Sequence, residues 1–212
     1  MNPAVIVMAK SPRPGRVKTR LCPPCSEREA GEIATAALTS TLEAVAGSRA
    51  AHLVIALEGA PGSWLPAGFD VIPQYGRGLA ERLARAFEDV GGPAVAIGMD
   101  TPQATPDLID QSFDALDEAD SALGPTVDGG YWAIGLRRPN DRAFAGVPMS
   151  LPSTYFEQQR RLHRLGLSCR VLPELRDVDH FSDALAVASL IPESRFAAAV
   201  RAVNDRLDQA SL

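Results

Sequence analysis

The 212-residue sequence predicts an α/β fold in which a mixed, mostly parallel sheet lies between helices. Short apolar segments at 3–9, 52–57 and 93–98 alternate with segments of helical periodicity, as in parallel sheets with crossover helices. The apolar segments 121–124 and 131–136 are joined by a link too short for a crossover helix, so we expect this pair to be antiparallel or offset. Ligands are then expected beyond the carboxyl ends of the parallel strands.

Periodicity and turn residues predict the remaining elements. Thr105 can cap a helix that has Pro106 at its first position. Thr154 and Glu157 match a capping box. We expect further strands at 69–73 and 168–172, and helices at 27–46, 79–90, 106–118 and 154–165, with two more from about Ser182 and Glu193.

Composition limits the class of protein. With 46% hydrophobic residues and no linker-like segment, the chain is expected to form one domain over residues 1–212. The net charge of -5 argues against a general nucleic-acid binder, because such binders need a basic surface. No signal peptide and no apolar run of about 18 residues is present, so we expect a cytoplasmic protein without a membrane span.

A basic loop follows the first predicted strand. Five cations lie within eleven residues that contain no carboxylate, and Gly15 would let backbone amides approach a phosphate. The loop matches neither a Walker loop nor a dinucleotide fingerprint, and a solvated surface turn is the alternative. The five cations are Lys10, Arg13, Arg16, Lys18 and Arg20.

Single carboxylates at two other strand ends are candidate metal ligands. Asp100 follows the strand at 93–98, and taken alone it is more readily a turn or cap residue than a metal ligand. Asp177 and Asp179 alternate in an extended segment and can supply a second carboxylate, although Asp179 is also a candidate N-cap. Mg²⁺ typically takes one or two carboxylates together with phosphate oxygens of a substrate.

The segment 124–132 combines paired glycines with Asp128, Tyr131 and Trp132, as expected of a loop that wraps a ligand. A hairpin with core aromatics is the alternative. Cys22 and Cys25 have CxxC spacing, but the only further thiol is Cys169, so a zinc site lacks its second pair.

Taken in order, five segments resemble an uncharacterised bacterial family of glycosyltransferase-A-like proteins, often labelled as transferases associated with radical-SAM and selenium domains. The resemblance spans about residues 4–185. Two positions depart from the family pattern: 77–80 reads RGLA in place of Gly-Asp-Leu-Gly, and His180 replaces a small hydroxyl residue. The five segments are AKSPRPGRVKTRL (9–21), PQYGRGLAERLARAF (73–87), AIGMDTP (96–102), LGPTVDGGYWAIGL (123–136) and DVDHFSD (177–183).

The resemblance implies a nucleotide-diphospho-sugar transferase fold, Rossmann-like in its layering, with Mg²⁺ or Mn²⁺ at Asp100 and Asp179. It places the nucleotide on the loop after the first strand and the sugar or acceptor near Asp128. We therefore expect Asp128 as the catalytic base. The expected nucleotide contacts are Lys10, Ser11, Gly15, Lys18 and Arg20, and the expected substrate contacts are Thr126, Gly129, Gly130 and Tyr131.

Three functions remain open at this point. The first is glycosyl transfer from a nucleotide sugar to a small acceptor. The second is nucleotidyl transfer from an NTP to a phosphorylated or carboxylated acceptor. The third is nucleotide binding without turnover, because a fold does not fix a function. The sequence leaves the oligomeric state open, a homodimer included.

Overall fold

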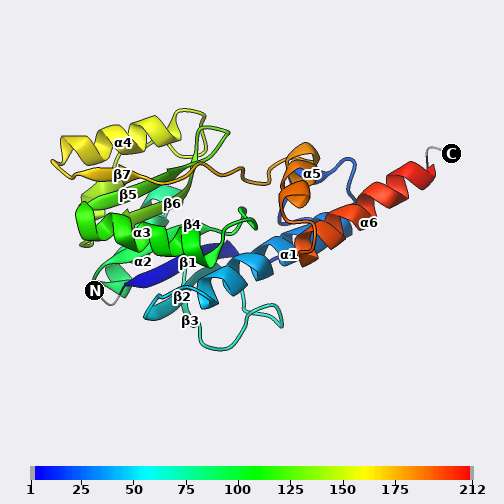
Figure 1. The fold of residues 1–212 in the computed structure, drawn as a ribbon, viewed down its shortest axis with the longest axis horizontal. Helices are drawn as coiled ribbons and strands as arrows, with labels where there is room; N and C mark the ends of the chain where they lie inside the picture. Colours follow the sequence, from blue (N-terminus) through cyan, green and yellow to red (C-terminus); the bar gives the residue numbers. More distant parts are fainter. Residues whose placement is uncertain (1–2, 211–212) are drawn as a thin grey trace.

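The computed structural model describes residues 3–210 (Figure 1). Its strands form one sheet in the order β3-β2-β1-β4-β6-β5-β7, in which β6 alone runs opposite to the others. This confirms the predicted mixed, mostly parallel sheet and the antiparallel pair. The strands are β1 (Ala4–Lys10), β2 (His52–Glu58), β3 (Asp70–Pro73), β4 (Ala94–Gly98), β5 (Ser121–Pro125), β6 (Tyr131–Leu136) and β7 (Cys169–Val171).

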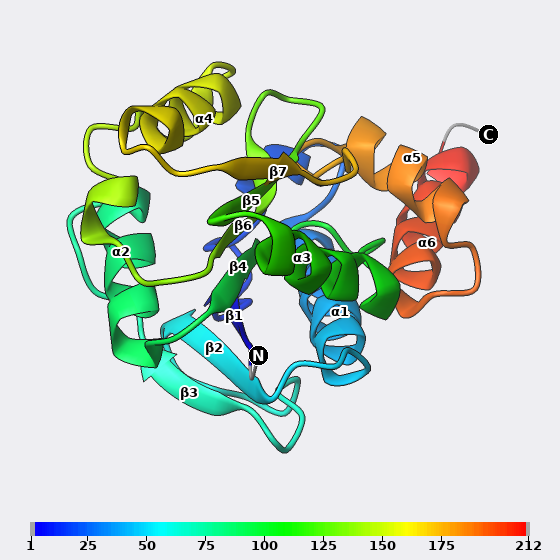
Figure 2. The same cartoon turned by 60° about the vertical axis from the view of Figure 1, so that its left-hand side comes forward.

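Helices cover both faces of the sheet. Figure 2 shows α1 and α3 on one face and α2 and α4 on the other. No helix within residues 3–210 combines the length and the hydropathy needed to cross a bilayer. The helices are α1 (Glu27–Ala46), α2 (Leu79–Val90), α3 (Pro106–Glu118), α4 (Thr154–Arg164), α5 (Phe181–Leu190) and α6 (Arg195–Ala210), with short 3-10 turns η1 (Thr19–Leu21) and η2 (Asp141–Ala143).

The apolar run of β1 serves both faces. Val5 and Val7 belong to the core cluster with α1 and α3, whereas Ile6 belongs to the cluster with α2 and α4. Alternate strand residues point to opposite faces, so a central strand covered on both sides has to be apolar throughout. This is why its sequence reads as a continuous hydrophobic segment.

A third apolar cluster lies away from the sheet. There α5 and α6 pack on the first half of α1, and Figure 1 shows α6 running alongside α1. Leu21 of η1 and Val178, which precedes α5, are both fully buried in this cluster. The loop that precedes α1 and the segment that precedes α5 are therefore anchored in the same apolar cluster, although they come from opposite halves of the sequence.

Helix starts show where local signals mislead. Thr105 caps α3 as predicted, since its side chain accepts from Leu108 N. The capping box at Thr154 is wrong, because α4 begins at Thr154 itself and Ser153 takes the cap position. Thr154 Oγ1 instead donates to the carbonyl of Pro148. Asp179 is likewise not an N-cap, because His180 directly precedes α5.

Candidate active site

Loops from the carboxyl edge of the sheet enclose a cleft of about 780 Å³, which adjoins a smaller cavity of about 260 Å³. The two share Lys10, Arg20, Asp100 and Asp179, and Lys18 lines the smaller one. The sheet thus brings together residues that the sequence places on separate loops. Of the predicted residues, the cleft is lined by Lys10, Arg20, Asp100, Thr126, Asp128, Gly130, Tyr131 and Asp179.

Three predicted contacts have structural roles outside the lining of these cavities. Ser11 is buried, and its main-chain N–H donates to the carbonyl of Glu58 at 2.8 Å. Gly15 has a φ of +70° and packs against Glu27. Gly129 has a φ of +90°, and a Cβ there would lie 2.0 Å from the carbonyl oxygen of Pro152.

Lys18 is the centre of the site. Its backbone is left-handed, with a φ of 49°, and its side chain is only 8% exposed. The ammonium lies 2.9 Å from Asp100 Oδ1 and 3.5 Å from Asp179 Oδ1, and it also donates to the carbonyl of Val178. The contacts with Asp179 and Val178 are hydrogen bonds, whereas the contact with Asp100 Oδ1 is an ion pair without hydrogen-bond geometry.

The charges around Lys18 keep it protonated. Burial by itself would lower its pKa, but the negative charge of Asp100, followed by those of Asp179 and Asp177, raises the pKa above the ordinary lysine value. Lys18 was expected to contact a phosphate, and here it contacts the two candidate metal ligands. The sequence pattern predicted its location at the site but not its partners.

The two acidic segments are held to each other through their backbones. Val178 N donates to the carbonyl of Asp100 at 2.9 Å, while the Val178 side chain is buried in the third apolar cluster. Because neighbours in an extended segment alternate in direction, Asp177 and Asp179 then face the cleft. Arg20 Nη1 lies 2.6 Å from Asp179 Oδ2 and completes the ion-pair network.

Asp100 and Asp179 fit a divalent cation that takes its remaining ligands from a substrate. Asp100 Oδ1 is buried and has no hydrogen-bond partner among residues 3–210, although the Lys18 ammonium lies 2.9 Å away as an ion pair. No three acidic, histidine or cysteine side chains of the described chain converge into a complete metal site. Two carboxylates plus phosphate oxygens form a normal Mg²⁺ environment.

Asp128 belongs to the tight turn between β5 and β6. Its Oδ1 accepts from the hydroxyl of Thr126 at 2.6 Å and from Gly130 N at 3.0 Å. Burial, followed by the negative charges of Asp128 and Asp179, raises the pKa of Asp177, which lines the same cleft, to about 6. This half of the cleft is therefore acidic.

The aromatic residues of this turn are packing residues more than stacking platforms. The hydroxyl of Tyr131 donates to Gln158, and burial raises its pKa. Trp132 is 2% exposed and donates to the carbonyl of Pro173, which for this residue matches the alternative of a hairpin with core aromatics. The close contact between Trp132 and Gly124 explains why a glycine stands in β5.

Sequence reasoning missed a charged network at the other end of the cleft. Lys10 Nζ lies 3.0 Å from Glu58 Oε1, and the second carboxylate oxygen of Glu58 accepts from Arg82. Gln74 donates to the carbonyls of Ala9 and Ala56 and accepts weakly from Arg82 at 3.5 Å. Lys10, Gln74 and Arg82 lie in segments of the family resemblance, but no motif contains Glu58, which the parallel pairing of β1 with β2 brings beside Lys10.

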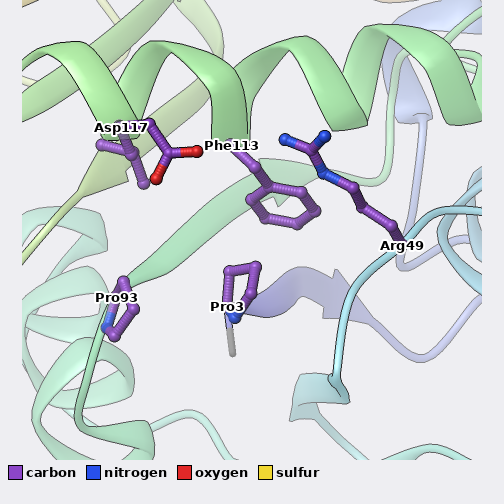
Figure 3. A pocket seen from close by; sticks show the side chains of 6 residues that line it. Pro3, Arg49, Pro93, Phe113 and Asp117 are labelled. Carbon is purple, nitrogen blue, oxygen red and sulfur yellow. The ribbon is translucent and has the colours of Figure 1, made fainter. Parts of the chain in front are cut away.

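Two other features are separate from this site. A cavity of about 250 Å³ lies at the opposite edge of the sheet, and Figure 3 shows Arg49 beside the ring of Phe113 there. Arg49 also pairs with Asp114, so the positive charge of Arg49 is already neutralised. Cys22 and Cys25 are free thiols. Burial, aided by Cys22 and Glu29, raises the pKa of Cys25 to about 11, which leaves it unreactive.

Comparison with known proteins identifies the fold. The model of a bacterial family described as "Uncharacterized protein conserved in bacteria (DUF2064)" matches residues 34–151. A crystal structure from Desulfovibrio desulfuricans G20, provisionally named as a nucleotide-diphospho-sugar transferase, is 26% identical. It superposes with a TM-score of 0.87 over 98% of this chain and 97% of its own. A search of curated proteins found no match.

More distant structures share the fold alone. Rv0371c from Mycobacterium tuberculosis H37Rv, solved in complex with manganese, is 19% identical with a TM-score of 0.57, covering 88% of this chain and 97% of its own. The 2-C-methyl-D-erythritol 4-phosphate cytidylyltransferase from Thermus thermophilus is 16% identical with a TM-score of 0.56, covering 90% and 98%. The predicted nucleotide-diphospho-sugar transferase fold is thus confirmed.

Proposed function

The chain belongs to the DUF2064 family of bacterial proteins, and from that premise we propose that it is a metal-dependent transferase with a nucleotide-activated donor. The observation that carries the proposal is the convergence of Lys18 and Arg20 with Asp100 and Asp179 at the carboxyl edge of the sheet. The structural likeness to a provisionally named nucleotide-diphospho-sugar transferase supports it.

Glycosyl transfer from a nucleotide sugar is the chemistry that we favour. A hydroxyl oxygen of the acceptor forms a bond to the anomeric carbon while the bond from that carbon to the diphosphate breaks. The diphosphate leaves with the electron pair, and Lys18 and Arg20 neutralise its charge. Mg²⁺ or Mn²⁺ held by Asp100 and Asp179 would supply further charge stabilisation. The manganese complex of Rv0371c supports this choice of cofactor.

Asp128 is proposed to take the proton of the acceptor. Its Oδ1 is held by Thr126 and Gly130, which fixes the carboxylate in one orientation and leaves Oδ2 without a hydrogen-bond donor among the described residues. A base has to be oriented before it can act efficiently. The turn that contains Gly129 and Gly130 supplies that orientation.

The acceptor is expected near Asp128, and the negative charge of this part of the cleft favours an uncharged acceptor. Asp128 and Asp177 both face this region, and the cation Arg176 is paired with Asp183 at 3.0 Å. A phosphorylated or carboxylated acceptor would bring further negative charge beside these carboxylates, which is unfavourable in a partly buried site. A hydroxyl of an uncharged molecule avoids this cost.

Nucleotidyl transfer is the second candidate. The basic loop and the two carboxylates would hold an NTP as well as a nucleotide sugar, with pyrophosphate leaving as the acceptor attacks the α-phosphate. The cytidylyltransferase from T. thermophilus shares this fold. The two chemistries differ in their small product.

A thermal-shift screen with nucleotides and nucleotide sugars, with and without Mn²⁺, tests the proposal. A ligand that binds only the folded state raises the melting temperature by mass action. We expect metal-dependent shifts, after which release of UDP or GDP from a nucleotide sugar identifies glycosyl transfer. Release of pyrophosphate from an NTP identifies nucleotidyl transfer. If no nucleotide shifts the melting temperature, the proposal is wrong.

A further inference from the structure

Lys18 is a buried cation that occupies the space between two carboxylates. Its ammonium is in ionic contact with one oxygen of Asp100 and one of Asp179, and it also donates to the carbonyl of Val178. The side chain is almost completely buried, whereas Arg20, on the outer side of Asp179, is 66% exposed. Lys18 and Asp179 are 161 residues apart in the sequence.

The contacts of Lys18 conflict with the role of a phosphate ligand that is permanently available. Because the side chain is only 8% exposed and three oxygens surround the ammonium, Lys18 has to move away from at least one of them before it can contact a phosphate oxygen. It also shields Asp100 Oδ1, the buried oxygen that a divalent cation would need. Without a cation at this place, two carboxylates at the same wall of the cleft would repel each other.

We propose that Lys18 is a built-in counter-ion that holds Asp100 and Asp179 together in the metal-free protein and leaves them when a nucleotide phosphate accepts its ammonium. The inference rests on the proposed function, because it takes the ligand to be a nucleotide phosphate. Metal and nucleotide then bind cooperatively, since each removes a contact that opposes the other, and such coupling is reciprocal. Lys18 is in this sense a positioning residue for the metal ligands.

The decisive measurement is the affinity for Mn²⁺ alone, without nucleotide, by electron paramagnetic resonance of free Mn²⁺. In the wild type, the metal has to displace a hydrogen-bonded ammonium, whereas Lys18→Met removes that competitor. Charged hydrogen bonds of this kind correspond to about a ten- to hundredfold change in affinity, so Lys18→Met should bind Mn²⁺ at least about tenfold more tightly.

Arg13→Met is the matched control. Arg13 is an exposed cation of the same loop, so this variant removes the same charge without touching the carboxylates. Its Mn²⁺ affinity should stay within about twofold of the wild type, as expected for a screened surface charge. If Lys18→Met fails to fold, Lys18→Gln, which keeps a hydrogen-bond donor, replaces it in the same titration.

A second arm measures cooperativity. Adding UDP or GDP should raise the Mn²⁺ affinity of the wild type and raise that of Lys18→Met by a smaller factor. If Lys18 has only a structural role, Lys18→Met will bind Mn²⁺ without nucleotide no more tightly than the wild type. This result would overturn the inference. Absence of measurable Mn²⁺ binding in both proteins also overturns it. If Lys18→Met binds Mn²⁺ more tightly but no nucleotide binds, the proposed function and the release of Lys18 by a nucleotide are wrong, while its role as counter-ion of the two carboxylates stands.

Discussion

The main-chain N–H of Val178 donates to the main-chain carbonyl of Asp100 across 2.9 Å. This bond joins the loop after β4 to the segment before α5 without using either carboxylate. The side chains of Asp100 and Asp179 can therefore be changed one at a time while the two segments stay together. Substitutions at these positions report on ligand binding more than on folding.

Asp100→Asn should lower the affinity for Mn²⁺ in the presence of a nucleotide by about a hundredfold or more, because it removes the negative charge of a direct ligand. Titration calorimetry measures this affinity. Asp117→Asn serves as the control, since Asp117 lines the separate cavity at the opposite edge of the sheet. An unchanged affinity in Asp100→Asn would remove Asp100 from the metal site.

Asp128→Asn should lower turnover by about 10²- to 10⁴-fold, the usual contribution of a general base. The Asn carbonyl oxygen can still accept from Thr126 and Gly130, so the turn and the nucleotide affinity should be preserved. Steady-state rates and a nucleotide titration together test this. Full turnover in Asp128→Asn would show that another group takes the proton.

Gly129→Ala should destabilise the fold by about 3 kcal/mol or more, because the new Cβ would collide with the Pro152 carbonyl and the backbone is left-handed. Gly146 also has a positive φ, but its Cβ position is open, so Gly146→Ala should cost only about 1–2 kcal/mol. Urea unfolding compares the two variants. Equal losses would mean that backbone conformation alone matters at Gly129.

Leu21→Ala should cost about 2–5 kcal/mol, as expected when a buried leucine is truncated. Because Leu21 anchors the loop that carries Lys18 and Arg20, nucleotide affinity should fall as well. Leu190→Ala is the control, because Leu190 is 67% exposed and its loss should stay within about 0.5 kcal/mol. Urea unfolding and a nucleotide titration on the same samples would reveal whether the two effects separate.

Glu29 should make the fold sensitive to acid. Its hydrogen bond from Arg206, followed by that from Ser26 N, lowers the pKa of Glu29 to about 2. A lowered folded-state pKa means that the ionised carboxylate stabilises the fold above the ordinary Glu value of about 4.5. This stabilisation is lost as the pH falls toward about 2.

Glu29→Gln should therefore melt at a lower temperature than the wild type at neutral pH, and the difference should shrink toward about pH 2. Melting curves across this range measure it. Glu32→Gln lies on the same helix and removes only an exposed pair with Arg28, so it should change the melting temperature little. A difference for Glu29→Gln that does not depend on pH would contradict the linkage.

The sequence predicted the sheet well because its strands are buried on both faces and read as apolar runs. The antiparallel direction of β6 could be predicted because the link between β5 and β6 is too short to hold a crossover helix. The partners of Lys18 could not be predicted, because they lie on loops that meet only after the sheet has formed. The sequence left Trp132 open for a related reason: an aromatic beside glycines suits either a ligand contact or a core position, and its packing on Gly124 becomes visible only in the structure.

The 161-residue separation between Lys18 and Asp179 has a consequence for biosynthesis. A nascent chain that ends before Asp179 already contains all seven strands, yet it lacks one wall of the cleft. Contacts between distant segments form late, because closing a long loop costs entropy before the contact is made. A chain released before Asp179 would thus lack both this wall of the cleft and the helices α5 and α6 that pack in the third apolar cluster.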